Sequence, residues 1–521
     1  MDQVNLGYSM KNIPMPNHKI YLQMFINSME KFSRNLDWRA HFFLNPPSKT
    51  THKENFGFKS LAPSPYVKEL KHFKEGLVNI VKDIKFENIH NSFQNKLEKD
   101  IKEIKKEKRI FVAGDKSTNF HKMTPQMYNQ LLDKSIQKEY KKAPLKSVIN
   151  IEKSHSNIVK NLELQDRVFR TTERQPFITV KDHKPNFANN PTCRLLNPTK
   201  PELGRISKQK LLKMISEVRQ KTKFNQWKNS DSVISWFSEL RDKKRLSFIQ
   251  FDLCEFYASI SENLLINALN FCAQYTKITE EDRKIILQCR KSYLCNKESI
   301  WVKKGNSKFD VTMGSLDSAE ICDIVGLYIL SQLQNLDLQI GLYRDDGLAA
   351  GFQTPRQLEN IKKKICKIFK DNQLSITIDA NLKVVNFLDV TFDLNTGLYK
   401  PFMKTNDKPI YVNKNSNHPP SILKNIPEAV TRRLSKISAN EDVFKAAIPP
   451  YQNALNMSGY DYVMKYEETQ ATQKEKKNRK RRIIWYNPPW SVNCSTKIGA
   501  KFLNLVDNCF PPKQLPSQNC Q

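Results

Sequence analysis

The chain has 521 residues, enough for two to four domains, and its 39% hydrophobic residues and only 14 glycines exclude a low-complexity or collagen-like protein. Ten cysteines without a Cys-x-x-Cys pair, no apolar run of membrane-spanning length and no apolar core in the first ten residues argue against a zinc framework, a membrane protein and a signal peptide. The formal net charge of +32, from 85 basic and 53 acidic residues, instead predicts a polyanionic partner, with nucleic acid as the leading candidate and an inert charged surface as the alternative.

The first 150 residues are predicted to be mostly helical. Aromatic and apolar residues recur at helical spacing between Tyr21 and Phe32, and the highly charged stretch 65–109 predicts one or two further helices with solvated faces. A short strand at 110–112 then leads into Gly114-Asp115-Lys116, and Thr124-Pro125 opens another helix.

Residues 174–198 predict a basic hairpin. Strands at 176–181 and 193–196 flank a turn rich in Pro and Asn. Lys181 and Arg194 lie on the two strands, and together they could hold a triphosphate, because Lys offers a point charge and Arg a bidentate fork. The alternative is a surface hairpin whose charge is incidental.

Residues 246–333 predict a strand followed by helices. The strand 246–253 ends near Asp252, and the capping-box spacing of Ser259 and Glu262 predicts the start of the helix 263–275. Gly314 precedes a helix that runs to about residue 333, and a glycine there lets a backbone or a base approach closely.

Two adjacent carboxylates, Asp345 and Asp346, lie in an apolar stretch that predicts two short strands joined by a tight turn. A buried turn rarely keeps two Asp residues unless a divalent cation neutralises them, although an ordinary Asp-Gly hairpin turn is the alternative. With Asp252, they could hold two divalent ions about 4 Å apart, as two-metal sites do. Hard oxygen ligands favour Mg²⁺, with Mn²⁺ as a substitute. The acids, the basic hairpin and the net charge together predict a template-directed polymerase.

The remaining segments extend this pattern. A helix at 358–370 has an apolar face and a lysine face, and strands follow at 375–379 and 390–394, so that residues 246–400 predict an α+β sandwich with the carboxylates gathered on its sheet. Residues 425–470 predict helices. The run from Lys474 to Arg482 holds seven basic residues and one acid, and it is a nuclear-import signal, a polyanion clamp or a solvated linker.

Several motifs in this order resemble those of reverse transcriptases. The catalytic motifs are matched by Phe251-Asp252-Leu253-Cys254-Glu255-Phe256-Tyr257-Ala258-Ser259-Ile260, Met313-Gly314-Ser315-Leu316 and Tyr343-Arg344-Asp345-Asp346, and the motif at the thumb junction by Asn386-Phe387-Leu388-Asp389-Val390. The sequence is most similar to the Penelope-like retroelement reverse transcriptases. That resemblance rests on Lys181-Asp182-His183-Lys184-Pro185, Leu203-Gly204-Arg205-Ile206-Ser207-Lys208-Gln209, Ser416-Asn417-His418-Pro419-Pro420 and Trp485-Tyr486-Asn487-Pro488-Pro489.

The resemblance implies a right-hand polymerase fold of fingers, palm and thumb, in the α+β class, behind a mostly helical N-terminal extension. The expected domains are the extension at 1–150, the fingers at 151–245, the palm at 246–395 with part of the fingers inserted at about 262–310, the thumb at 396–470, and a basic linker with a C-terminal segment at 471–521. The GIY-YIG nuclease motif that often follows the polymerase in this family is not found, so a truncated copy or a lineage that primes on existing DNA ends is expected.

The resemblance also implies roles for individual residues. Asp252, Asp345 and Asp346 would bind the metals, and Leu253 would add a backbone carbonyl. The other expected roles are triphosphate binding for Lys181 and Arg194, exclusion of a ribose 2′-hydroxyl for Tyr257, contact beneath the templating base for Gly314, and protonation of pyrophosphate for Lys383. The alternative for the aromatic pair is that Tyr257 packs in the core and Phe256 faces the substrate.

The expected function is therefore DNA synthesis on RNA by a retrotransposon enzyme. Its partners would be an RNA template, a DNA primer or target end and dNTPs, with no membrane, and no protein partner is predictable. The nucleus is the expected location, with the cytoplasm as an alternative. Two other hypotheses stay open: a degenerate copy that only binds RNA, and an RNA-templated RNA polymerase.

Overall fold

The computed structural model describes residues 2–4, 11–45, 63–162, 175–184, 186–198, 203–305, 309–404, 408–468 and 486–511. The predicted basic run 474–482 and Trp485 lie outside these residues. The described chain mixes helices and strands, which confirms the predicted α+β class. No helix among the described residues combines the length and the apolar character that a membrane crossing requires.

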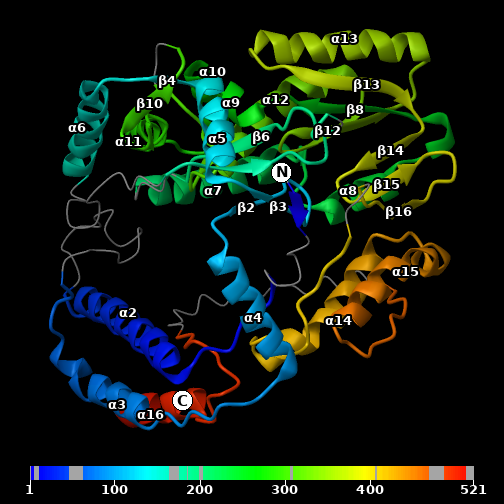
Figure 1. Ribbon diagram of the computed structural model, residues 1–521. Helices are drawn as coiled ribbons and strands as arrows, with labels where there is room; N and C mark the ends of the chain where they lie inside the picture. Colours follow the sequence, from blue (N-terminus) through cyan, green and yellow to red (C-terminus); the bar gives the residue numbers. More distant parts are fainter. Residues whose placement is uncertain are drawn as a thin grey trace, which may run out of the picture.

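A five-stranded sheet forms the centre of the larger part of the molecule (Figure 1). Its strands are, in spatial order, β13 (Ile376–Leu382), β8 (Ser247–Leu253), β12 (Asp346–Gly351), β11 (Gln339–Tyr343) and β7 (Asn225–Gln226). The short β7 runs parallel to β11, and the other neighbours are antiparallel. The two strands that carry the predicted carboxylates, β8 and β12, are therefore hydrogen-bonded neighbours.

One face of this sheet is covered by helices. They are α7 (Leu203–Thr222), α10 (Glu262–Ala273), α12 (Ser318–Leu333) and α13 (Pro355–Asp371), with α11 (Glu280–Gln288) beside α7. On α13, Leu358, Ile361 and Ile365 are buried while the lysines point outward, which confirms the predicted two-faced helix. The predicted cap of α10 is wrong by two residues: Ser261, not Ser259, accepts the hydrogen bond from Leu264 N, because residues 256–259 form the separate helix α9 (Phe256–Ser259).

The opposite face packs against a second core. Its elements are α8 (Ser230–Glu239), the small sheet of β14 (Val384–Phe387), β15 (Val390–Asp393) and β16 (Tyr399–Pro401), and the helices α14 (Pro420–Lys436) and α15 (Glu441–Met457). Alternation along β8 sends Ile249 and Phe251 to the helical face and Phe248 to this second core. Gln250 also points this way, since its side chain donates to Asn386 O of β14 at 2.9 Å.

A third unit contains the predicted basic hairpin, β5 (Phe177–Val180) and β6 (Cys193–Leu196). It packs with β2 (Ile110–Ala113), β3 (Phe120–Met123) and α5 (Pro125–Glu139), and β4 (Tyr140–Lys142) pairs with β10 (Ser299–Lys303), which pairs with β9 (Leu294–Asn296). The helix α6 (Leu145–Asn161) lies beside α11. Residues 110–142 were predicted as part of the N-terminal extension, but Val112 and Met123 bury their side chains against Ile178 and Val180 of the hairpin.

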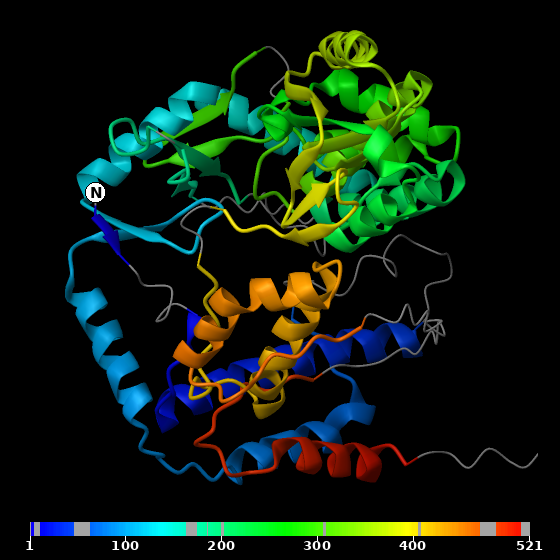
Figure 2. The same ribbon diagram turned by 90° about the vertical axis from the view of Figure 1, so that its right-hand side faces the viewer.

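The first two long helices and the last helix of the described chain form a helical layer (Figure 2). It contains α2 (His18–Leu44), α3 (Lys71–Lys82) and α16 (Ile498–Cys509), joined to the third unit through α4 (Ser92–Lys106) and through β1 (Asp2–Val4), which pairs with β3. Phe32 and Phe73 pack against Phe502, with ring centroids 5.6 and 6.0 Å away. The predicted C-terminal segment therefore packs on the N-terminal helices, and α14 and α15 lie between this layer and the central sheet (Figure 2).

Candidate active site

Carboxylates from two distant segments meet at one end of the central sheet. Asp252, near the end of β8, is the direct cross-strand partner of Asp346, the first residue of β12. Opposite residues of an antiparallel pair project from the same face, which here is the face of Gln250, β14 and β15. Asp345 is adjacent, because its carbonyl accepts a hydrogen bond of 2.9 Å from Leu253 N. The structure thus brings together the predicted Asp252, Leu253, Asp345 and Asp346.

The tight turn lies two positions earlier than an Asp346-Gly347 hairpin would place it. Tyr343 pairs with Asp346, so Arg344 and Asp345 form the connection, and Arg344 has a left-handed φ of 53°. Such a conformation is unfavourable for a non-glycine residue and is concentrated at functional sites. Gly347 lies inside β12 opposite Phe251, and a Cβ at this position would overlap the Phe251 ring. The Asp-Gly turn interpretation is therefore wrong, and the glycine serves packing.

The site accumulates negative charge. Burial, followed by the charges of Asp345 and Asp252, raises the pKa of Asp346 to about 6. Loss of hydration and then the charge of Asp345 raise the pKa of Asp252, while Lys116 and, more weakly, Lys184 and Lys404 act against this rise. A cation at this end of the sheet would relieve the repulsion.

The residues fit a magnesium site that substrate completes. Among the described residues, no group of three or more His, Cys, Asp or Glu side chains is arranged to hold a metal ion by itself. Mg²⁺, however, is usually bound by one or two carboxylates together with water and substrate phosphates. Asp252 and Asp346 supply two carboxylates from one sheet face, and Asp345 adds an adjacent third. These three residues could hold Mg²⁺, or Mn²⁺, once phosphate oxygens are present.

The raised pKa of Asp346 predicts that Mg²⁺ binds more tightly as the pH rises through about 6. Below that pH the carboxyl carries a proton, which must leave before the oxygen can bind a cation. We expect the dissociation constant for Mg²⁺, measured by titration calorimetry without nucleic acid, to fall as the pH is raised across this window. In Asp346→Asn this part of the pH dependence should disappear, and an unchanged pH profile in the variant would contradict the assignment.

The same shift has a consequence for stability. Because the pKa of Asp346 in the folded protein lies above its unfolded value of about 4, the folded state holds the proton more tightly. In the absence of metal, this tighter proton binding stabilises the folded state. The stabilisation is fully present below about pH 4 and is lost as the pH rises to about 6.

The aromatic pair after Asp252 is divided between core and site. Phe256 is 2% exposed and belongs to the core, whereas Tyr257 is only partly buried. Tyr257 lies near Cys322 of α12. Burial raises its pKa, and the charges of Arg344 and Asp345 act on it as well. Tyr257 itself packs against the edge of the same core, and Phe256 does not have the exposure that a substrate contact needs.

The basic hairpin adjoins this end of the sheet. Burial and then the charges of Arg194 and Lys138 lower the pKa of Lys181, so Lys181 and Arg194 lie close together as predicted. Arg194 pairs with Asp115 of the β2–β3 loop at 3.3 Å, a contact that sequence analysis missed. Glu255, three residues after Asp252, pairs with Lys138 and attracts the Lys181 charge.

Gly314 lies in a tightly packed loop that contacts the chain just after β6. Its φ is 106°, and a Cβ there would lie 3.0 Å from Asn197 O, so the close approach is made by the backbone that follows β6. The loop is held by Asp317, which accepts hydrogen bonds from Ser207 and Arg290 and, at 3.1 Å, from Ser315 Oγ. α12 accordingly begins at Ser318 and not directly after Gly314.

Lys383 is not at the carboxylates. Its Nζ donates to Leu246 O and, at 3.1 Å, to Lys244 O, which precede β8. Asp252 lies at the other end of β8, about 20 Å away for six extended residues. The antiparallel pairing of β13 with β8 returns the chain to the start of β8, so proximity to the thumb junction in sequence was misleading. The structure does not support Lys383 as the proton donor.

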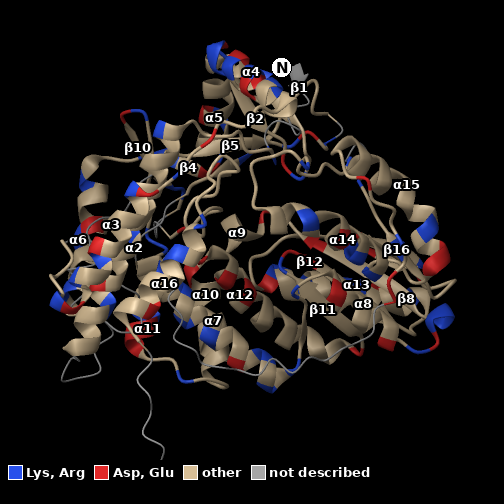
Figure 3. Cartoon of the chain, turned by 90° about the horizontal axis from the view of Figure 1, so that it is seen from below, with Lys and Arg blue, Asp and Glu red and all other residues tan. Residues whose placement is uncertain are grey.

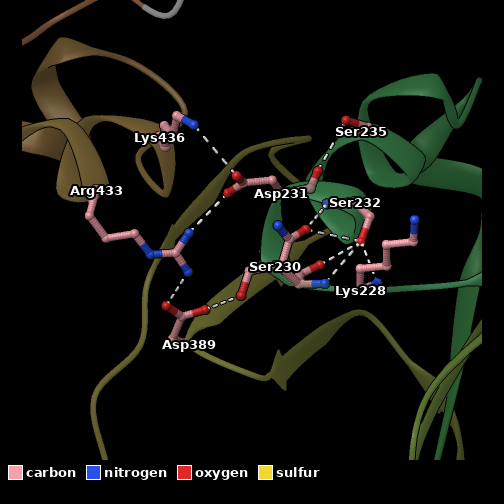
Figure 4. Close-up of polar contacts among 9 residues, drawn as sticks. Lys228, Ser230, Asp231, Ser232, Ser235, Asp389, Arg433 and Lys436 are labelled. Atoms are coloured by element: carbon pink, nitrogen blue, oxygen red, sulfur yellow. Dashed lines mark hydrogen bonds and ion pairs between the residues drawn. The ribbon is translucent and has the colours of Figure 1, made fainter. Parts of the chain in front are cut away.

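Asp389, in the stretch that resembles the thumb-junction motif, ties two units together (Figure 4). Arg433 of α14 bridges Asp389 and Asp231, the latter at 2.9 Å, and Lys436 lies 3.5 Å from Asp231. Ser230, at the start of α8, also donates to Asp389. This junction, which sequence analysis did not predict, connects α14 to the small sheet and α8.

The charge of the chain is widely distributed. Lys and Arg lie on many elements, with acidic residues among them (Figure 3). The lysines of α13 lie on the helical side of the central sheet, whereas Asp252 and Asp346 project from the other side. The three lysines that act on the Asp252 charge, Lys116, Lys184 and Lys404, come instead from three separate segments.

One family model matches a short part of the chain. The animal helix-turn-helix domain matches residues 410–462. These residues contain α14 and α15, and Asn440 caps the second helix by accepting from Val443 N at 2.9 Å. The match covers too little of the chain to assign a family, and no curated protein matches the sequence.

Solved structures of polymerases are similar over most of the chain. Telomerase from Candida albicans in complex with a fragment of telomeric RNA has a TM-score of 0.48 at 12% identity, covering 75% of each chain. Apo telomerase from Candida tropicalis has a TM-score of 0.43 at 11% identity, covering 84% of this chain and 88% of that one. The RNA-dependent RNA polymerase of a human picobirnavirus has a TM-score of 0.37 at 10% identity, covering 88% and 96%. Because these scores are below 0.5, we base the functional proposal on the site itself.

Proposed function

We propose that the chain is an RNA-directed DNA polymerase of the right-hand type, related to the Penelope-like retroelement enzymes. The observation that carries the proposal is the cross-strand pairing of Asp252 with Asp346, which gathers carboxylates from two segments next to the hairpin of Lys181 and Arg194. In this proposal the central sheet is the palm, the β5–β6 unit belongs to the fingers, and α14 with α15 forms the thumb.

The residues have distinct roles in the proposed nucleotidyl transfer. Bound Mg²⁺ ions would lower the pKa of the primer 3′-hydroxyl and neutralise the leaving pyrophosphate. Asp252 and Asp346 would hold the Mg²⁺ ions from two adjoining strands, with Asp345 and the Leu253 carbonyl beside them. Lys181 and Arg194 orient the triphosphate, because cationic donors form strong hydrogen bonds with phosphate oxygens.

The proposed partners are an RNA template, a DNA primer or target end and dNTPs, which agree with the net charge of +32. A nuclear location belongs to the same proposal and is supported by the basic run 474–482. Retroelement origin rests on the sequence motifs quoted above.

Primer extension tests the proposal. The chain is incubated with Mg²⁺, an RNA template and a DNA primer, with dNTPs in one reaction and rNTPs in the other. Extension with dNTPs alone is the expected result. Extension with rNTPs as readily as with dNTPs would favour the RNA-polymerase alternative, and RNA binding without extension would favour a degenerate copy.

Tyr257→Ala is expected to admit ribonucleotides. Removing the ring opens space where a 2′-hydroxyl would otherwise clash, and an overpacked contact typically costs about 1–3 kcal/mol, so discrimination against rNTPs should fall roughly 10- to 100-fold. The measurement is the ratio of kcat/KM for dNTP and rNTP. Tyr257→Phe, which keeps the ring, should retain discrimination. A Tyr257→Ala variant that rejects rNTPs as strongly as the parent would exclude this role.

Arg194→Ala is expected to raise the KM for dNTP about tenfold or more, because it removes a charge-assisted hydrogen bond to phosphate. Affinity for an RNA–DNA hybrid, measured by fluorescence anisotropy, should change much less. If the dNTP dependence stays the same, the charge of the hairpin is incidental.

A further inference from the structure

We propose that Lys116, on the loop between β2 and β3, is a further nucleotide-binding residue that contacts the triphosphate of the incoming nucleotide, and that Asp182 is the positioning residue for its loop. This inference rests on the proposed polymerase function. It concerns a segment that lies more than 60 residues before the basic hairpin (181 minus 116 is 65) and that the sequence predicted as part of a helical extension.

The backbone of the loop is joined to the hairpin. Gly114 forms a parallel bridge with Val180, and Asp115 N donates to Val180 O at 2.6 Å. Gly114 N also donates to Asn119 O at 2.8 Å, which closes the loop on itself. The loop that carries Lys116 is therefore hydrogen-bonded to the end of β5, next to Lys181.

A nearly buried polar cluster holds the side of the loop that follows Lys116. Asp182 Oδ2 accepts hydrogen bonds from Ser117 Oγ at 2.7 Å and Asn119 Nδ2 at 3.0 Å, and His121 Nε2 lies 3.2 Å away. The side chains of His121 and Asp182 are 4% and 6% exposed. Burial opposes the charge of Asp182, but the three hydrogen bonds outweigh it and lower the pKa of this carboxyl. Asp182 thus stays ionised and fixes three residues of the β2–β3 segment on the fingers hairpin.

The preceding residue is held as well. Asp115 is buried, pairs with Arg194 at 3.3 Å, and its carbonyl lies 3.0 Å from His183 Nδ1. With Asp115 and Ser117 both anchored, the direction of Lys116 between them is set by the backbone, which has a left-handed φ of 66°. A fixed backbone conformation at an exposed lysine is consistent with a positioned charge.

The loop of Lys116 adjoins the two residues predicted to hold the triphosphate. Asp115, the preceding residue, pairs with Arg194 at 3.3 Å, and Gly114 forms a bridge with Val180, the neighbour of Lys181. Lys116 and Arg194 thus approach the end of the sheet from two adjoining hairpins. A lysine ammonium on a loop held against Arg194 and next to Lys181 is suited to bind phosphate oxygens of the same triphosphate.

Lys116→Ala is expected to raise the KM for dNTP about tenfold or more, with a smaller change in affinity for an RNA–DNA hybrid. Lys116→Arg should restore part of the loss, because it keeps the charge. The matched control is Lys122→Ala on the same hairpin, whose Nζ pairs with Glu107 at 2.6 Å. The KM for pyrophosphate in the reverse reaction should rise in Lys116→Ala and stay unchanged in the control.

The outcomes separate this inference from the proposed function. If the parent protein extends no primer, the proposed function fails. If the parent is active and Lys116→Ala has the same KM for dNTP and for pyrophosphate as Lys122→Ala, the Lys116 inference fails while the polymerase proposal stands. Parallel losses in hybrid affinity and dNTP use would also overturn it, because they would indicate contact with the nucleic-acid backbone.

The positioning role has its own test. Asp182→Asn removes the charge that holds Ser117, Asn119 and His121, and we expect it to raise the KM for dNTP with little change in kcat at saturating dNTP. In the double variant with Lys116→Ala, the KM should rise no further than in Lys116→Ala alone, since both act through one contact. Multiplicative effects on KM, in variants whose thermal melting matches the parent, would overturn the positioning role.

Discussion

Asp345→Asn is expected to abolish primer extension, with a loss of at least about a thousandfold in single-turnover rate, because electrostatic stabilisation at the reacting centre is usually the largest catalytic term. The substitution keeps the size of the side chain, and the hydrogen bond from Leu253 N goes to the backbone carbonyl, so the turn should persist. Only the charge next to Asp252 and Asp346 is removed. The affinity for an RNA–DNA hybrid should therefore stay close to that of the parent.

The matched control is Asp371→Asn, an exposed aspartate at the end of α13, on the helical side of the sheet. It should extend primers as the parent does. If Asp345→Asn retains a rate similar to this control, Asp345 does not take part in catalysis. If extension and hybrid binding are lost together, the variant is misfolded, which thermal melting would reveal.

Arg290→Ala is expected to lower the free energy of unfolding by about 3–5 kcal/mol, the usual cost of removing one partner of a buried ion pair. Arg290 and Asp317 are both fully buried, with exposures of 0%. Without Arg290, the Asp317 carboxylate would keep only the hydroxyl donors Ser207 and Ser315, which leaves a charge uncompensated in the core. Urea unfolding, followed by circular dichroism, measures the change.

Two variants check the cause of this loss. Arg283→Ala removes an arginine of α11, the helix that ends two residues before Arg290. Its partner Glu280 is largely exposed, so the variant should cost less than about 1 kcal/mol through this ion pair. The double variant Arg290→Met with Asp317→Leu removes both charges and should be more stable than Arg290→Ala. If the double variant is less stable than Arg290→Ala, the buried charge is not the cause.

Much of the site followed from local patterns in the sequence. The run 246–253 formed β8, the Asp345-Asp346 pair came to the junction of β11 and β12, and the apolar face of α13 was read correctly from its spacing. These features are predictable because the period of apolar residues decides whether a segment is a strand or a helix, and which side it buries. Two carboxylates in an apolar stretch also stand out without a structure, since burial of charge is costly.

The sequence by itself therefore determined the central elements around the site, their buried faces and the acidic residues, whereas pairings between distant segments were decided by the tertiary structure. The turn at Arg344 depends on the register of β11 against β12, and the displacement of Lys383 depends on β13 pairing with β8 in the opposite direction. The Arg290–Asp317 pair and the loop of Lys116 likewise join residues whose polar side chains look exposed in sequence. The spacing of residues within a segment does not predict such partners. Each contact is stabilised by burial and hydrogen bonding that arise only when distant segments come together in the folded chain.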